Sequence, residues 1–219
     1  MFSVLEFNPL RQMLRGSATA RRSAMYHGMS VLLLTLSLSQ AFDGAWIHAK
    51  ATVAQLLIAN AWSDVREGQG SVSKPWPWAD TWPVARIQYN GDTPRDLYVL
   101  AGAQGNSLAF GPGHLFGSAL PGETGVSIVG GHRDTHFAFL QHANIGDALV
   151  VTPASGETRR YVITDKAIAN SLTDPLLAMP YSSQLMLVTC YPFDAVQSGP
   201  LRYVVTAELQ NVDQQETML

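Results

Sequence analysis

The sequence is poor in cysteine and in charge, and both shortages exclude whole classes of function. Cys190 is its single cysteine. It has no partner in its own chain for a disulfide, and a site built of several thiolates is excluded. It is therefore either an inert buried thiol or a reactive one. A formal net charge of -3, with basic residues gathered only near the N-terminus, argues against a nucleic-acid-binding surface.

The N-terminal segment is rich in arginine and is followed by an apolar run. Arg11, Arg15, Arg21 and Arg22 precede residues 29–42, which carry no charge. This asymmetry is typical of an export signal whose N-terminus stays in the cytoplasm. The apolar run is short for a membrane span of about 20 residues. We nevertheless favour a retained single-pass anchor in the inner membrane, because the apolar character extends back to residue 25 and no helix breaker follows. The rest of the chain is then expected to face the periplasm.

Residues 45–65 have apolar side chains at helical spacing, which predicts an amphipathic helix that packs on the folded domain or on the membrane. The apolar members are Trp46, Ala49, Val53, Leu56, Leu57 and Trp62. Residues 68–71 are expected to end the helix, and the prolines in residues 74–78 predict a stiff extended connector. The expected segments are an anchor (1–43), a helix and linker (44–73), a folded domain (74–210) and a loose polar tail (211–219).

From residue 80 onward the periodicity changes from helical to strand-like. Short runs rich in Val, Ile, Leu and Tyr alternate with Gly, Pro, Asn and Asp, a pattern that favours a β-barrel or sandwich over a βαβ fold. The expected strands are residues 84–89, 97–101, 126–129, 148–152, 160–164, 185–190 and 201–209.

Three polar residues stand at strand ends in this scheme. Cys190 closes a buried strand just before Tyr191 and Pro192, where the missing proline N–H stops a regular ladder. His132 follows the strand 126–129 and two glycines. Arg202 opens the last strand, where a permanently charged guanidinium is suited to stabilise an oxyanion.

Several motifs together resemble the sortase family, and within it the sortases of Gram-negative bacteria. The sequence LVTC at residues 187–190 resembles the family signature TLxTC, and His132 and Arg202 take the family's His and Arg positions. The segments KPWPWADTWPVARI (74–87), AFGPGH (109–114) and GGHRDT (130–135) fit the same family. One departure is Met186, which stands where the signature opens with threonine.

This resemblance implies an all-β fold, an eight-stranded sortase barrel behind a membrane anchor and amphipathic helix. It also implies a cysteine transpeptidase that needs no cofactor or metal. Cys190 would attack an LPxTG-like sorting motif near the C-terminus of a target protein, and His132 would protonate the leaving amine. An amine acceptor from peptidoglycan or a protein, or else water, would resolve the thioester.

Weaker candidates and other functions stay open. Asp134 is a candidate to orient His132, Thr189 is a supporting residue, and His114 is expected to be structural. We do not expect a zinc site at His132 and His136, since two histidines at that spacing bind a metal chiefly on a helix. The alternatives to a sortase are another exported cysteine acyltransferase, such as an L,D-transpeptidase, or a non-catalytic membrane-tethered binding domain.

Overall fold

The computed structural model describes residues 9–68, 72–105, 107–154, 156–174, 183–197 and 199–210. Two compact units are formed, Met1–Thr52 and Val53–Leu219. The described residues of the first unit all belong to helix α1 (Pro9–Arg66), and the last turns of this helix belong to the second unit. The tail predicted to be loose, residues 211–219, lies outside the described residues.

In the first unit, α1 presents apolar side chains to solvent. Leu32, Leu33, Leu34 and Leu36 are all more than half exposed. Within the described residues one helix is long and apolar enough to cross a membrane, and this candidate stretch is Arg22–Arg66. The helix agrees with a membrane segment near the N-terminus. Retention of that segment and its orientation stay predictions.

In the second unit, the last turns of α1 pack on the barrel with a face that matches the predicted one only in part. Trp62 of the predicted apolar stripe is buried, but Val53 and Leu56 of that stripe are exposed. The other buried residues of these turns are Ala54, Ile58, Ala61 and Val65. The Trp62 ring lies 6.0 Å from the ring of Tyr98 on the neighbouring strand. The helix ends at Arg66, and Gly68 follows with a φ of +79°, a conformation that glycine adopts without strain.

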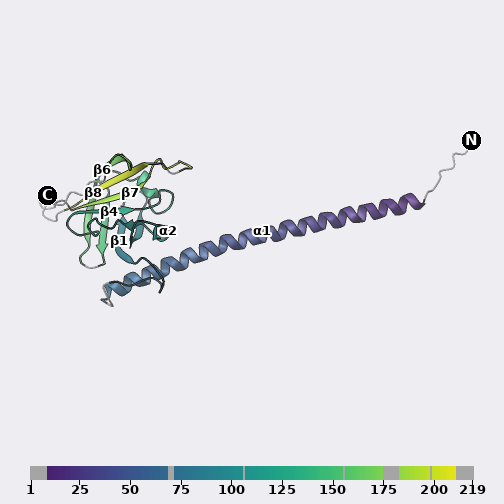
Figure 1. Cartoon of the computed structure of the whole chain (residues 1–219), viewed down its shortest axis with the longest axis horizontal. Coiled ribbons are helices and arrows are strands. Elements are labelled where there is room, and N and C mark those ends of the chain that lie inside the picture. The colour runs from purple at the N-terminus through teal and green to yellow at the C-terminus, as the bar shows by residue number, and fades with distance from the viewer. Residues whose placement is uncertain are drawn as a thin grey trace, which may run out of the picture. The chain divides into compact units, whose positions relative to one another are not determined.

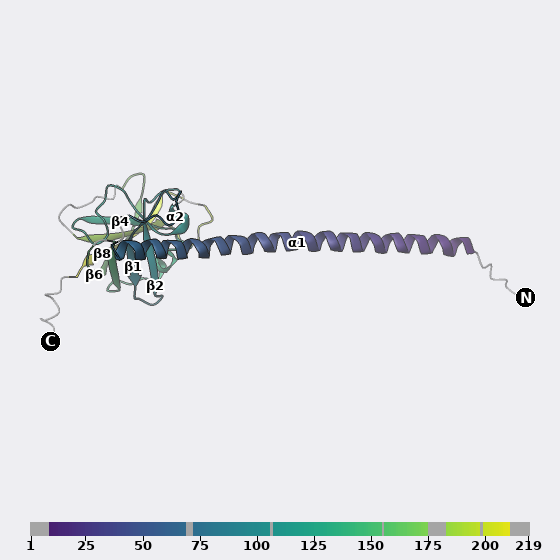
Figure 2. The same ribbon diagram turned by 90° about the horizontal axis from the view of Figure 1, so that it is seen from below.

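Eight strands close into a barrel, which confirms the predicted fold class (Figures 1 and 2). Their order around the barrel is β1-β2-β3-β4-β7-β8-β6-β5. Two short helices, α2 (Ser107–Phe110) and η1 (Ala138–Gln141), lie in the connections. The strands are β1 (Pro83–Tyr89), β2 (Arg95–Ala101), β3 (Gly113–His114), β4 (Val126–Gly130), β5 (Ala148–Pro153), β6 (Arg159–Asn170), β7 (Gln184–Cys190) and β8 (Leu201–Leu209).

Alternating burial along the strands separates a barrel interior from an outer face. In β7, Leu185, Leu187 and Thr189 are buried, while Met186, Val188 and Cys190 are partly exposed. This is the period of two that a half-buried strand requires. The interior is filled mainly by aliphatic and aromatic side chains, among them Ile87, Val129, Phe139, Leu149, Ile163 and Val205.

The structure corrects the sequence-based description in two places. The connector predicted to be extended contains a turn at residues 75–78, and the Ala79 N–H donates to the Trp76 carbonyl at 2.9 Å. The strand predicted over residues 160–164 runs on to Asn170, because its pairing with β8 continues past a register shift between Ile163 and Asp165.

Candidate active site

Cys190 is the last residue of β7 and points away from the barrel interior. Its neighbour Thr189 is only 2% exposed, whereas the free cysteine Cys190 is partly exposed. Because side chains alternate along a strand, Cys190 shares the outer face with Met186 and Val188. The thiol is therefore not the buried inert one that a lone cysteine often is, and it stands where a peptide lying on this face can reach it.

Arg202 lies directly across from Cys190 on β8. The two strands are antiparallel, and the Cys190–Arg202 pair is the last in their register. The Tyr191 N–H donates to the Leu201 carbonyl at 3.0 Å, the pattern that flanks a non-hydrogen-bonded pair. Opposed Cα atoms of such a pair are only about 4.5 Å apart, and their side chains share one face. This register puts the side chains of Arg202 and Cys190 next to one another on the same face of the two strands.

The Arg202 side chain is held at one end by backbone carbonyls. Its Nη1 donates to the carbonyls of Gly199 at 2.7 Å and Leu201 at 2.8 Å. Within the described residues, Nη2 and Nε make no hydrogen bond. Among the residues that the structure describes, the guanidinium thus is held at one end and keeps donors without a partner, which is what a stabiliser of developing negative charge needs.

His132 enters from the strand on the other side of β7. Strands β4 and β7 are parallel, with Gly130 opposite Val188. The pairing continues one step beyond β4, because the Gly131 N–H donates to the Val188 carbonyl at 3.0 Å. His132 and Cys190 follow next on the two segments, and neighbouring strands lie about 4.8 Å apart. The register therefore starts the His132 loop beside the cysteine.

Two contacts tie the segment around His132 to the segment around Cys190. Thr189 Oγ1 donates to the Gly131 carbonyl at 2.7 Å, just before the histidine. Just after it, Arg133 donates from Nη1 to the Pro192 carbonyl at 2.8 Å and from Nη2 to the Ala195 carbonyl. His132 thus lies between two residues that are anchored to the cysteine segment. The sequence analysis did not predict the Arg133 contacts, because no local sequence pattern indicates hydrogen bonds to residues 59 and 62 positions away.

Gly131 is required by close packing. A Cβ at this position would lie 2.7 Å from the ring of Phe137, which is fully buried. The Phe137 N–H donates to the His132 carbonyl at 2.9 Å, so this ring closes the His132 loop against the core. The glycine allows the loop to approach this closely.

The remaining candidates are placed less centrally. Asp134 is exposed, and within the described residues it makes no hydrogen bond or ion pair with His132. Burial lowers the pKa of His136, and the charge of nearby His132 lowers it further. No group of three or more His, Cys, Asp and Glu side chains in the described part of the chain is arranged to hold a metal ion.

His114 is the last residue of β3 and is not part of the arrangement around Cys190. It pairs with Val129 of β4 and is 4% exposed. Its Nε2 is 2.9 Å from the Ala119 carbonyl oxygen and 3.0 Å from Ser118 Oγ. These contacts fit the structural role expected for it, although they lie beside a cavity of about 420 Å³ that His114 helps to line.

Cys190, His132 and Arg202 thus follow one another across three neighbouring segments at one end of the barrel. The thiol can act as a nucleophile, the histidine can move a proton, and the arginine can hold negative charge on an oxygen. That combination suits acyl transfer through a thioester.

Comparisons with known proteins give consistent results. Residues 91–210 match the family model of the sortase domain. Sortase D of Bacillus subtilis (strain 168) is 31% identical over 110 residues, which is 50% of this chain and 56% of that protein. The chain therefore spans about half the length of this curated relative.

Solved structures with the same fold are also sortases. Sortase A from Corynebacterium diphtheriae superposes with a TM-score of 0.54 and 31% identity, covering 65% of this chain and 67% of that one. A Clostridium perfringens Sortase D5 transpeptidase gives a TM-score of 0.59 over 73% of this chain and 99% of its own, and at 20% identity this likeness concerns the fold alone.

Proposed function

The chain belongs to the sortase family, and we propose that it is a membrane-attached cysteine transpeptidase with Cys190 as its nucleophile. The observation that carries the proposal is the strand register around β7. It puts Arg202 across from Cys190 on one side and starts the His132 loop on the other. A thiol flanked by a fixed cation and a histidine is the arrangement that thioester chemistry requires.

The first half-reaction forms an acyl-enzyme. The Cys190 thiolate attacks a backbone carbonyl of the sorting motif, and the carbonyl oxygen becomes an oxyanion that faces the guanidinium of Arg202. The tetrahedral intermediate collapses, the C–N bond breaks, and His132 gives its proton to the leaving amine. The products are a thioester on Cys190 and a peptide with a new amino terminus.

The second half-reaction runs the same steps in reverse with another amine. His132 accepts a proton from the incoming amine, which attacks the thioester carbon. The C–S bond breaks, Cys190 leaves as thiolate, and a new amide links donor to acceptor. If water attacks instead, the outcome is hydrolysis.

The donor motif, the cellular site and the subclass are the finer parts of the proposal. The donor is an LPxTG-like motif near the C-terminus of an exported protein, and the acceptor is an amine of peptidoglycan or of another protein. The anchor is residues 1–43, residues 44–73 form the amphipathic helix and linker, and the catalytic domain over residues 74–210 faces the periplasm. Asp134 and Thr189 support His132, and the motifs favour the sortases of Gram-negative bacteria.

The test is amide formation between a donor and an acceptor. The purified full chain, in detergent, is incubated with a library of LPxTG-like peptides and an excess of a small amine. Mass spectrometry then looks for donor fragments that have gained the amine. We expect such products with the wild-type chain and none with Cys190→Ala. Products of equal yield from both proteins would refute the assignment of the nucleophile.

A further inference from the structure

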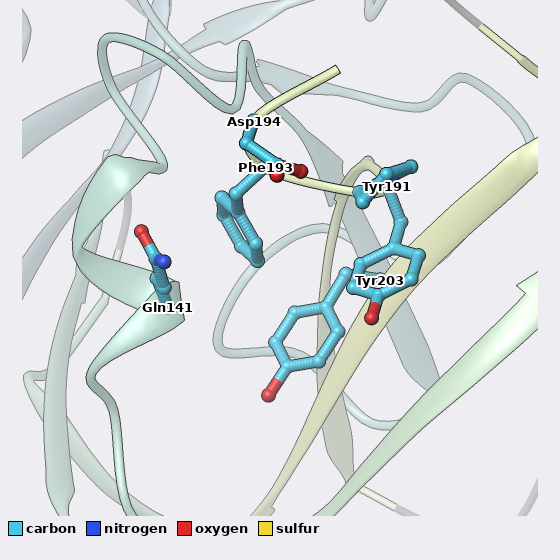
Figure 3. Close-up of a pocket in the computed structure, with 6 residues that line it drawn as sticks. Gln141, Tyr191, Phe193, Asp194 and Tyr203 are labelled. Carbon is cyan, nitrogen blue, oxygen red and sulfur yellow. The ribbon is translucent and has the colours of Figure 1, made fainter.

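A cavity beside the active site has no role in the steps described above. Its volume is about 400 Å³, and it is lined by Gln141, Tyr191, Pro192, Phe193, Asp194 and Tyr203. Figure 3 shows Gln141 of η1 on one side and the aromatic side chains on the other. The cavity therefore lies between the helix that follows the His132 loop and the segment that follows Cys190.

The lining is aromatic and acidic. The ring of Tyr203 packs at 5.3 Å from Phe193 and at 6.1 Å from Tyr191. Asp194 adds a carboxylate and Gln141 an amide, and none of the described lining residues is basic. The faces of aromatic rings attract cations, and each such contact contributes roughly 0.5–2 kcal/mol. A carboxylate beside the rings strengthens the preference for a positive group.

The cavity lies on a different face of the strand pair from the thiol. Tyr203 follows Arg202 on β8 and stands opposite the buried Thr189, so it faces the other way from the Cys190–Arg202 pair. A donor peptide along the outer face leaves this cavity open. The neighbouring η1 belongs to the segment that begins with His132, and Arg133 binds the Pro192 carbonyl of the cavity wall. The cavity therefore adjoins the side of the site where His132 donates and accepts protons.

We propose that this cavity binds a cationic side chain of the acceptor, beside the amine that attacks the thioester. The attacking amine must be unprotonated, whereas a group held by aromatic rings and a carboxylate must be charged, so they are two different groups. The acceptor class is a peptide with a free amine next to a lysine-type ammonium. This inference rests on the proposed function, because it names the second substrate of the same site.

The test compares two acceptors that differ in one charge. Glycyl-lysinamide and glycyl-norleucinamide share the attacking amine, but only the first carries a side-chain ammonium. Their dissociation constants are measured by titration calorimetry on the purified full chain in detergent. We expect the wild-type chain to bind the lysine peptide about tenfold more tightly. Equal affinities would overturn the inference.

Variants of the cavity test whether this preference arises there. Phe193→Leu removes a ring while keeping an apolar side chain, and Asp194→Asn removes the carboxylate. Each should cut the preference for lysine to about threefold or less, while Phe193→Tyr, which keeps the ring, should retain it. Asp165→Asn, an identical change on the exposed side of β6, is the matched control and should keep the tenfold preference. A full preference in both Phe193→Leu and Asp194→Asn would refute this location.

Failure of this inference is distinguishable from failure of the proposed function. The binding measurement needs no turnover, and donor cleavage is measured without any acceptor. Donor cleavage without a preference for lysine removes the acceptor site and leaves the transpeptidase. A preference for lysine that the two variants abolish supports the cavity even before a donor is identified.

Discussion

The hydrogen bond from Thr189 to Gly131 offers a sharp test of how the site is held together. The Thr189 hydroxyl is buried and donates over 2.7 Å to the carbonyl just before His132. Thr189→Val keeps the branched shape but removes the donor. The loss of a buried hydrogen bond should lower the free energy of unfolding by about 1–3 kcal/mol. Because the bond fixes the start of the His132 loop, cleavage of the donor peptide should also slow, by up to about a hundredfold.

Thr81→Val is the matched control for this change. Thr81 is also 2% exposed, and it donates over 2.7 Å to the Ala101 carbonyl, at the end of the barrel opposite to Cys190. Urea unfolding should show a similar loss of stability in both variants. Initial rates of donor cleavage should fall only in Thr189→Val. If the two variants lose equal stability and both cleave at the wild-type rate, the Thr189 bond does not position His132.

Three further predictions follow from the contacts at the site. Arg202→Lys keeps the positive charge but loses the planar guanidinium. In a steady-state assay, kcat for donor cleavage should therefore fall by about 10²–10³-fold. A kcat equal to that of the wild type would exclude the oxyanion role. Arg133→Ala removes the hydrogen bonds to the Pro192 and Ala195 carbonyls. We therefore expect kcat to fall about tenfold with little change in KM, and Arg133→Lys to restore only part of the lost kcat. A wild-type kcat in the alanine variant would contradict this prediction. Burial and the charge of His132 lower the pKa of His136. The unfolded chain therefore binds the proton more readily, and the folded state loses stability as the pH falls below about 6.5. Urea unfolding of His136→Gln at pH 7.5 and 5.5 should show a smaller loss of stability between the two pH values than the wild type, and an equal loss would rule out His136 as its source.

Much of the barrel was predictable because its strands carry a local signal. Strands β1 and β7 combine β-branched residues with alternating burial. Strand β8 is rich in β-branched residues and was predicted over the residues where it is found. Strand β3 escaped prediction because its two residues, Gly113 and His114, form no apolar run. It is defined by its neighbours β2 and β4, which are distant in sequence.

The face of α1 that packs on the barrel was predicted less well for a similar reason. Val53 and Leu56 fit the apolar stripe by periodicity alone, yet the barrel contacts the helix on the side of Ile58, Ala61 and Trp62, of which only Trp62 belongs to the predicted stripe. Periodicity indicates that one face is apolar, but the shape of the partner decides which side chains are covered.

At the candidate site, the sequence suggested the residues but not their contacts. Cys190, His132 and Arg202 were proposed because each stands where a strand ends and a motif marks it. Arg133 and the Tyr191 to Tyr203 aromatic cluster were missed, because their roles depend on loops that meet only in the folded chain. Tyrosines directly after Cys190 and Arg202 were the one available signal for the cavity.

The central claim is that Cys190 becomes acylated by a sorting peptide. The full chain is mixed with the LPxTG-like library without added amine, quenched in acid and digested, and peptides that contain Cys190 are weighed by mass spectrometry. We predict a thioester adduct on Cys190 whose mass equals the donor fragment, absent from Cys190→Ala and lost on treatment with hydroxylamine. Folded protein that cleaves a donor without any adduct on Cys190, or an adduct at another residue, would contradict the account.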